Sequence, residues 1–85
     1  MSITVTLRFF ASIREAIGHG SEACSTSAGD VAALRDSLIA RGAPYAQALA
    51  RGKALRIAVD QCMGQETTPL HDGAEVAFFP PVTGG

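Results

Sequence analysis

Apolar and polar side chains alternate strictly along residues 3–10. One face of this segment carries Ile3, Val5, Leu7 and Phe9, and the other carries Thr4, Thr6, Arg8 and Phe10. A period of two that is rich in β-branched residues predicts a strand with one buried face. Alternation also predicts a strand at about 54–60 and a final strand over 75–79, while weaker patterns indicate short strands at 21–26 and 64–67.

Two helices are predicted by a different spacing. Ile13 and Ile17 lie four residues apart before Gly18, which predicts a short helix over 11–17. The main helix is predicted over about 28–41. Its apolar face consists of Val31, Leu34 and Leu38, after a Ser27-x-x-Asp30 capping box and before a glycine cap at Gly42.

Shorter signals complete the pattern. Tyr45, Ala46, Ala48 and Leu49 predict one more helical turn after Pro44, and Asp72-Gly73 is typical of a turn. One long helix and four or five strands predict an α+β fold, in which the helix packs across one face of the sheet. Pro80-Pro81 cannot donate to a strand ladder, so we expect a domain over 1–79 and an extended tail over 80–85.

Composition excludes several classes of function. The chain has 85 residues, enough for one small domain, and its formal net charge of -1 provides no basic surface for nucleic acid. No apolar stretch approaches the ~20 residues of a membrane span. The first residues lack the basic region and apolar run of a signal peptide. We therefore expect a cytoplasmic protein that binds neither nucleic acid nor membranes, with Cys24 and Cys62 as reduced thiols.

Few side chains indicate catalysis. His19 and His71 stand in predicted turns, where a solvated ring is the simpler interpretation. Neither histidine has a metal-ligand spacing with Cys24 or Cys62, which we interpret as small, partly buried apolar residues. We therefore expect no metal site, no bound cofactor and no catalytic side chain, and predict that the chain works with a larger partner.

The C-terminal residues carry the clearest chemical signal. Val82, Thr83, Gly84 and Gly85 follow the two prolines, which favour an extended chain. Glycine has no Cβ, so Gly84 and Gly85 could pass through a narrow tunnel in another protein. Adenylation would give the poorly electrophilic terminal carboxylate a good leaving group. A sulfur nucleophile could then displace AMP and leave a thiocarboxylate.

The sequence resembles the small, sulfur-carrying subunits of molybdopterin synthases, a family of ubiquitin-like β-grasp proteins. The residues that carry the resemblance are Phe9-Phe10-Ala11, Ile13-Arg14-Glu15, Leu34-Arg35, Ala58-Val59-Asp60-Gln61, Asp72-Gly73 and the last eleven residues, 75–85. It departs from the family at Asp60, where Asn is expected, and over 18–26, which has no pattern of the family. Neither departure touches the tail.

The resemblance implies a function. An ATP-dependent activating enzyme adenylates Gly85, and a sulfur donor protein supplies the sulfur of the thiocarboxylate. The large synthase subunit accepts the tail and converts cyclic pyranopterin monophosphate into molybdopterin, within a heterotetramer. In this scheme ATP is used by the activating enzyme, and the small chain is a carrier without catalytic side chains.

A docking surface follows from the alternation in a β-grasp sheet, where the first and last strands lie side by side. Val76 and Phe78 then point inward, whereas Phe10 and Phe79 point outward as an apolar patch. By the resemblance, Met63 joins this patch. Charges at the rim are expected from Arg8, Arg14 and Arg56, although ordinary solvated side chains explain them equally well.

Three other functions remain open from the residues alone. A carrier for thiazole or cysteine synthesis would also use Gly-Gly, although thiazole carriers resemble this chain less. A protein modifier would be joined through Gly85 to lysines of its targets. A non-covalent adaptor would have an unreactive tail.

Overall fold

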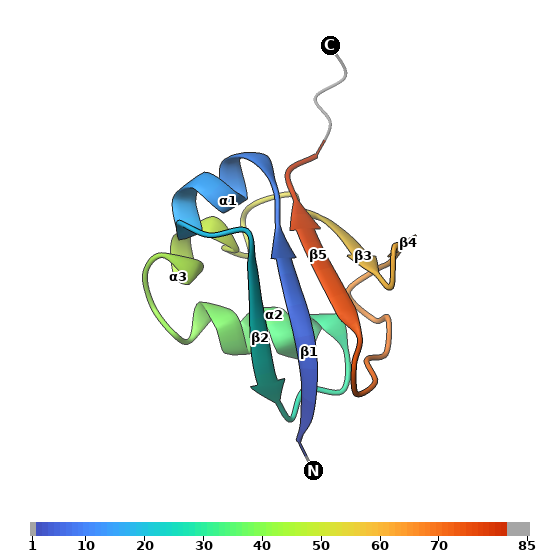
Figure 1. The fold of residues 1–85 in the computed structure, drawn as a ribbon. Coiled ribbons are helices and arrows are strands. Elements are labelled where there is room, and N and C mark those ends of the chain that lie inside the picture. Colours follow the sequence, from blue (N-terminus) through green and yellow to red (C-terminus); the bar gives the residue numbers. More distant parts are fainter. Residues whose placement is uncertain (1, 82–85) are drawn as a thin grey trace.

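The computed structural model describes residues 2–81 and shows a five-stranded mixed sheet with three helices (Figure 1). The strands are β1 (Ile3–Phe9), β2 (Ser21–Thr26), β3 (Arg56–Val59), β4 (Cys62–Met63) and β5 (Glu75–Phe79). The helices are α1 (Ala11–Ile17), α2 (Val31–Ile39) and α3 (Tyr45–Ala48). The strand order is β2-β1-β5-β3-β4, and only the central pair, β1 with β5, is parallel. The predicted α+β class and the adjacency of the first and last strands are confirmed.

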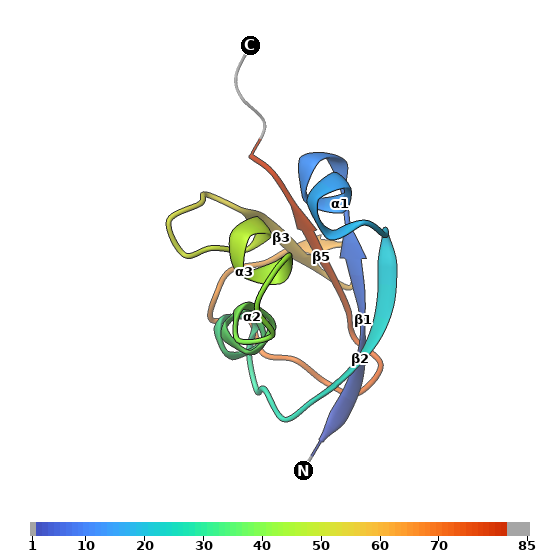
Figure 2. The ribbon, with the colours of Figure 1, turned by 90° about the vertical axis from the view of Figure 1, so that its left-hand side faces the viewer.

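The core lies between the sheet and the helices, with α2 and α3 on one side of the sheet (Figure 2). Phe9 and Phe78 meet at its centre, paired across β1 and β5, with ring centroids 6.1 Å apart. The inward face predicted for β1 is confirmed, because Val5, Leu7 and Phe9 are buried. Burial of apolar side chains is the main favourable term in folding, so this alternation determines which face of the sheet remains outside.

The main helix begins later than predicted. Asp30, not Ser27, is the N-cap, and its side chain accepts a hydrogen bond from Ala33 N at 2.9 Å. The backbone before α2 instead pairs with the segment that precedes β5, since Leu70 N donates to Gly29 O at 3.0 Å. This pairing holds the chain extended up to Asp30, so the capping box is wrong and α2 spans Val31–Ile39 instead of 28–41.

The short strand predicted at 64–67 is also wrong, because β4 occupies Cys62–Met63. Asp60 and Gln61 both have positive φ angles, 52° and 68°, which makes them the centre of a two-residue hairpin turn. The turn brings β4 back against β3, with Ala58 opposite Met63. A loop of this type matches the right-handed twist of the flanking strands, and it ends β3 at Val59 instead of 60.

Two smaller predictions need correction. The first strand ends at Phe9, and Phe10 is the N-cap of α1 instead of the last strand residue. Cys24 is buried as expected of an apolar residue, but Cys62 is exposed because its two-residue strand forms the edge of the sheet. The short helices, the strand at 21–26 and the turn at Asp72-Gly73 are confirmed, with Gly73 at φ 86°.

Candidate functional site

The sheet face that the helices leave open carries a continuous apolar surface, here called the docking face. It consists of Phe10, Ala58, Met63, Ala77 and Phe79. Ala58 lies opposite Met63 on one side and opposite Ala77 on the other, so three strands contribute to one row. Ala77 alternates with the core residues Val76 and Phe78 and therefore faces away from them.

Two aromatic rings form one end of the docking face. Phe10 and Phe79 have ring centroids 6.2 Å apart at an interplanar angle of 84°, the edge-to-face geometry that aromatic pairs favour. Phe10 is 42% exposed and Met63 is 62% exposed, and these are the large apolar side chains that remain exposed within residues 2–81. Phe79 is half-buried. Phe10 and Phe79 therefore face outward, as predicted. Exposed apolar surface of this kind is typical of interaction sites, and the role of these residues in binding a partner stays a prediction.

Two arginines border the docking face, one on each side of β5. The guanidinium of Arg8 lies 5.6 Å from the centre of the Phe10 ring and 3.4 Å from a carboxylate oxygen of Glu75. Arg56 is exposed on β3, directly opposite Phe79 in the register. Arg14 does not belong to this rim, because its side chain lies against Gly20, directly before β2.

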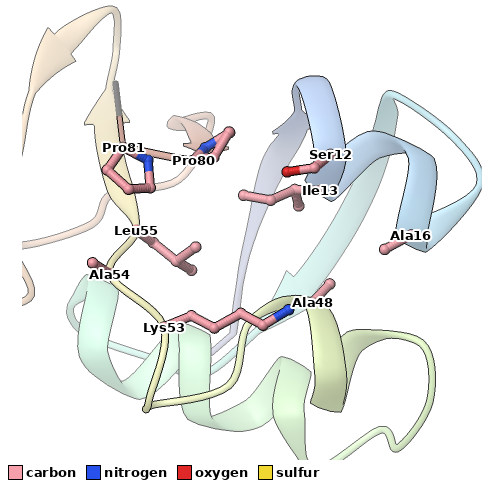
Figure 3. A pocket seen from close by; sticks show the side chains of 9 residues that line it. All are labelled: Ser12, Ile13, Ala16, Ala48, Lys53, Ala54, Leu55, Pro80 and Pro81. Atoms are coloured by element: carbon pink, nitrogen blue, oxygen red, sulfur yellow. The ribbon is translucent and has the colours of Figure 1, made fainter. Parts of the chain in front are cut away.

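The start of the tail borders a cavity of about 300 Å³ (Figure 3). Its lining residues are Ser12, Ile13, Ala16, Ala48, Lys53, Ala54, Leu55, Pro80 and Pro81. Figure 3 shows the two prolines on one side and Ser12 and Ile13 of α1 on the other. Phe79 of the docking face therefore leads directly into a segment that packs beside α1. The tail residues Val82, Thr83, Gly84 and Gly85 lie outside the described residues.

A buried arginine holds one wall of this cavity. Arg35 is only 4% exposed, and its guanidinium donates to Leu49 O at 2.8 Å, Ala50 O at 2.6 Å and Lys53 O at 3.1 Å. It also forms an ion pair with Glu66 at 2.9 Å. No role was predicted for Arg35 from the sequence. The sequence did contain a signal, because Arg35 lies next to Leu34 on the apolar face of α2. A charged side chain that is buried on such a face needs several hydrogen-bond partners.

Both histidine rings are exposed in part, as predicted, but each also contacts a carboxylate, and these contacts were not predicted. His19 Nε2 lies 2.9 Å from Glu22, which also accepts from Tyr45 and Arg41. Burial raises the pKa of Glu22, but the bonds from Tyr45, Arg41 and His19 outweigh it and hold this pKa at about 2. His71 Nε2 lies 2.6 Å from Asp60. Glu22 thereby ties β2 to α3 and to the end of α2.

Within residues 2–81, no group of three or more His, Cys, Asp or Glu side chains is arranged to hold a metal ion. None of the helices in this part of the chain is long and apolar enough to cross a membrane. The described site thus consists of an exposed apolar face, a rim of arginines and the start of the tail. Exposed apolar surface with charged groups at its edge is typical of a surface that binds another protein.

Comparison with known proteins agrees with this geometry. The model of the ThiS family matches residues 7–85. The molybdopterin synthase sulfur carrier subunit of Escherichia coli is 43% identical over 81 residues, covering 95% of this chain and 99% of that protein. The Haloferax volcanii protein HVO 2177 superimposes with a TM-score of 0.80 at 27% identity, covering 99% of this chain and 88% of that one.

A solved complex is also similar. One chain of the complex of subunits 1 and 2 of molybdopterin-converting factor from Helicobacter pylori is 30% identical, with a TM-score of 0.62 and coverage of 98% of this chain and 100% of that one. These likenesses confirm the resemblance and the ubiquitin-like β-grasp fold. The chain belongs to the ThiS family.

Proposed function

We propose that this chain is the sulfur carrier subunit of a molybdopterin synthase and that Gly85 carries the sulfur. The observation that carries the proposal is the continuity of the docking face with the tail, since Phe79 is followed directly by Pro80. A partner that covers the docking face is therefore placed to receive the tail. The names of the relatives identify the pathway, and the Helicobacter pylori complex supports the large subunit as that partner.

The proposed chemistry takes place at the terminal carboxyl group. An activating enzyme transfers AMP from ATP to the carboxylate of Gly85 and releases pyrophosphate. The terminal sulfur of a persulfide on a donor protein then attacks the acyl carbon and displaces AMP, which forms an acyl disulfide. A thiol cleaves the S–S bond of this acyl disulfide by disulfide exchange, which releases the thiocarboxylate of Gly85 and leaves the thiol in a disulfide with the donor sulfur. In the large subunit this sulfur passes to cyclic pyranopterin monophosphate. Two such transfers complete molybdopterin.

The chain's own residues dock and position the tail. Four residues follow Pro81, and an extended chain covers at most about 3.5 Å per residue, so the carboxyl group can reach at most about 14 Å beyond Pro81. That reach suits an active site that opens beside the interface, within a cytoplasmic heterotetramer. The large subunit, the activating enzyme and the sulfur donor each need access to this end of the molecule.

Intact mass tests the proposal most directly. The purified chain is incubated with ATP, the activating enzyme and a sulfur donor. A gain equal to the mass difference between sulfur and oxygen supports a carrier, whereas covalent ladders indicate a protein modifier and an unchanged mass indicates an adaptor. Molybdopterin formation after addition of the large subunit and cyclic pyranopterin monophosphate identifies the pathway, and omission of ATP is the control.

Phe79→Ala is expected to weaken association with the large subunit by ~1–3 kcal/mol, the range for an aromatic residue at the centre of an interface. The folding stability should change little, since Phe79 lies outside the core cluster. Titration calorimetry measures the affinity. Gln47→Ala, an exposed position on α3, is the control. Equal affinity of Phe79→Ala and wild type would contradict the assignment of the docking face.

Gly84→Ala tests the fit of the tail, because it keeps the carboxyl group and adds one methyl. If Gly84 passes through a closely fitting tunnel, the methyl displaces the reacting carbon, and small displacements can reduce a rate about a hundredfold. We expect thiocarboxylate formation or sulfur transfer to fall at least about tenfold, with docking retained. The two steps are measured separately in single-turnover assays. Gly52→Ala, in an open loop, is the matched control, and wild-type rates for Gly84→Ala would show that Gly84 is only a spacer.

A further inference from the structure

His71 lies between two hydrogen-bond acceptors. Its Nε2 is 2.6 Å from Asp60 Oδ2, and its Nδ1 is 2.8 Å from the backbone oxygen of Asp72. A carbonyl oxygen and an ionised carboxylate accept but cannot donate. A neutral imidazole carries one N–H and can satisfy only one of these partners. Both contacts together therefore require the doubly protonated, positively charged ring.

The position of this pair connects it to the docking face. Asp60 is the first residue of the turn between β3 and β4, and His71 lies in the loop before β5. The other carboxylate oxygen of Asp60 accepts from Glu75 N at 3.0 Å, so the turn is tied to β5 as well. Met63 follows three residues after Asp60. Its strand, β4, has only two residues and pairs on one side, with β3. Two backbone hydrogen bonds flank this segment, from Asp60 N to Glu75 O and from Gly64 N to Ile57 O, both at 2.8 Å, and the pair of Asp60 with His71 adds a side-chain contact to them.

We propose that protonated His71 and Asp60 form a clasp that holds the β3–β4 turn and thereby positions Met63 for docking of the partner. His71 is a positioning residue, because it acts through Asp60 and does not belong to the docking face. The identity of the partner rests on the proposed function, whereas the clasp is a property of the free chain.

The sign of the pH dependence follows from the groups around the ring. Asp60 faces it from the β3–β4 turn and Asp72 is its neighbour, while the Glu75 side chain is engaged with Arg8. The hydrogen bonds to Asp60 and to the Asp72 carbonyl raise the pKa of His71, and the bond from His71 lowers the pKa of Asp60. Because the folded-state pKa of His71 is raised, the clasp is complete below the ordinary value of about 6.5 and is lost as the pH rises through the raised value.

Asp60→Asn gives this proposal a specific test. The amide oxygen of asparagine can still accept from Glu75 N, and asparagine tolerates the positive φ of this turn. Its amide nitrogen, however, is a donor and would face Nε2. A neutral ring that donates from Nδ1 to Asp72 O and accepts at Nε2 would then satisfy both contacts. The variant should therefore favour neutral His71, in place of the charged form.

The first measurement is the NMR titration of the free, full-length chain in a His19→Gln background, which leaves one histidine. In the chain that keeps Asp60, we expect the pKa of His71 to lie above the ordinary histidine value. In Asp60→Asn, we expect the pKa of His71 to be lower than in the chain that keeps Asp60. An unshifted titration with Asp60, or an unchanged titration in the variant, would overturn the clasp. This measurement does not depend on any partner.

The second measurement is the affinity for the large subunit between about pH 5.5 and 8.5, the range in which histidine titrates. For the wild-type chain the affinity should fall about twofold to fivefold as the pH rises, as expected for loss of an exposed ion pair. The affinity of Asp60→Asn and of His71→Gln should not show this fall. Groups of the partner titrate equally with all three chains, so subtraction of a variant's pH profile from the wild-type profile removes their contribution. Identical profiles for all three chains would overturn the positioning role. Absence of binding at every pH would instead contradict the proposed function, while the NMR titration still decides the clasp.

Discussion

Deletion of Gly85 is expected to abolish sulfur transfer and leave the fold intact. In the proposed function the terminal carboxyl group of Gly85 is the group that is adenylated and that carries the sulfur, so its position relative to the partner's active site decides whether transfer occurs. The chain without Gly85 would end at Gly84, one residue short. An extended residue spans about 3.5 Å, far more than the 0.5 Å tolerance of a reacting group.

The measurement is molybdopterin formation in a reconstituted synthase, together with thiocarboxylate formation by mass. Addition of one residue after Gly85 should have the same effect, because it moves the carboxyl group by the same distance in the other direction. Circular dichroism and affinity for the large subunit are the controls, and both should remain close to wild type. Normal molybdopterin production by the shortened chain would refute the carrier hypothesis.

Phe78→Ala is expected to reduce the free energy of unfolding by ~3–5 kcal/mol, the usual range for truncation of a buried phenylalanine. Phe78 is fully buried and stacks on Phe9, and its backbone pairs with Phe9 on one side and Ile57 on the other. The substitution leaves a cavity at the junction of three strands. A rigid sheet cannot close such a cavity by moving one side chain.

Urea unfolding measures this effect, and Phe79→Ala is the matched control, since it removes the same side chain one residue further along β5. The two variants should separate stability from docking: Phe78→Ala loses stability, and Phe79→Ala loses affinity. The reverse result would show that the facing of β5 is wrong by one residue. Loss of both properties in both variants would show that the docking face and the core are not independent.

The sequence was sufficient for the features that depend on local periodicity. Alternation along residues 3–9 and 75–79 is decided by neighbours two positions apart, so the buried faces of β1 and β5 could be read directly. The outward positions of Phe10 and Phe79 followed from the same pattern. The resemblance, carried mainly by the last eleven residues, added the sulfur carrier function and the place of Met63 in the docking face.

Other features depended on residues far apart in the chain. The α2 helix begins at Val31 and not at the predicted residue 28, because the backbone before it pairs with the segment before β5. The β4 strand lies at Cys62–Met63 and not at the predicted 64–67, because Asp60 and Gln61 form a tight turn. The weak alternation in the residues that follow did not predict this turn.

The same reason applies to the side chains that were missed. Arg35 contacts carbonyls about fifteen residues away, and His71 meets Asp60 across two loops. Hydrogen bonds between such groups need both partners in place, and only the packed chain brings them together. The sequence by itself thus determined which faces of the strands are buried, and it predicts that the C-terminal carboxyl group is the reacting group. Only the tertiary structure decided which polar groups meet, such as Arg35 with three carbonyl oxygens and His71 with Asp60, because the partners of a hydrogen bond carry no periodic signal in the sequence.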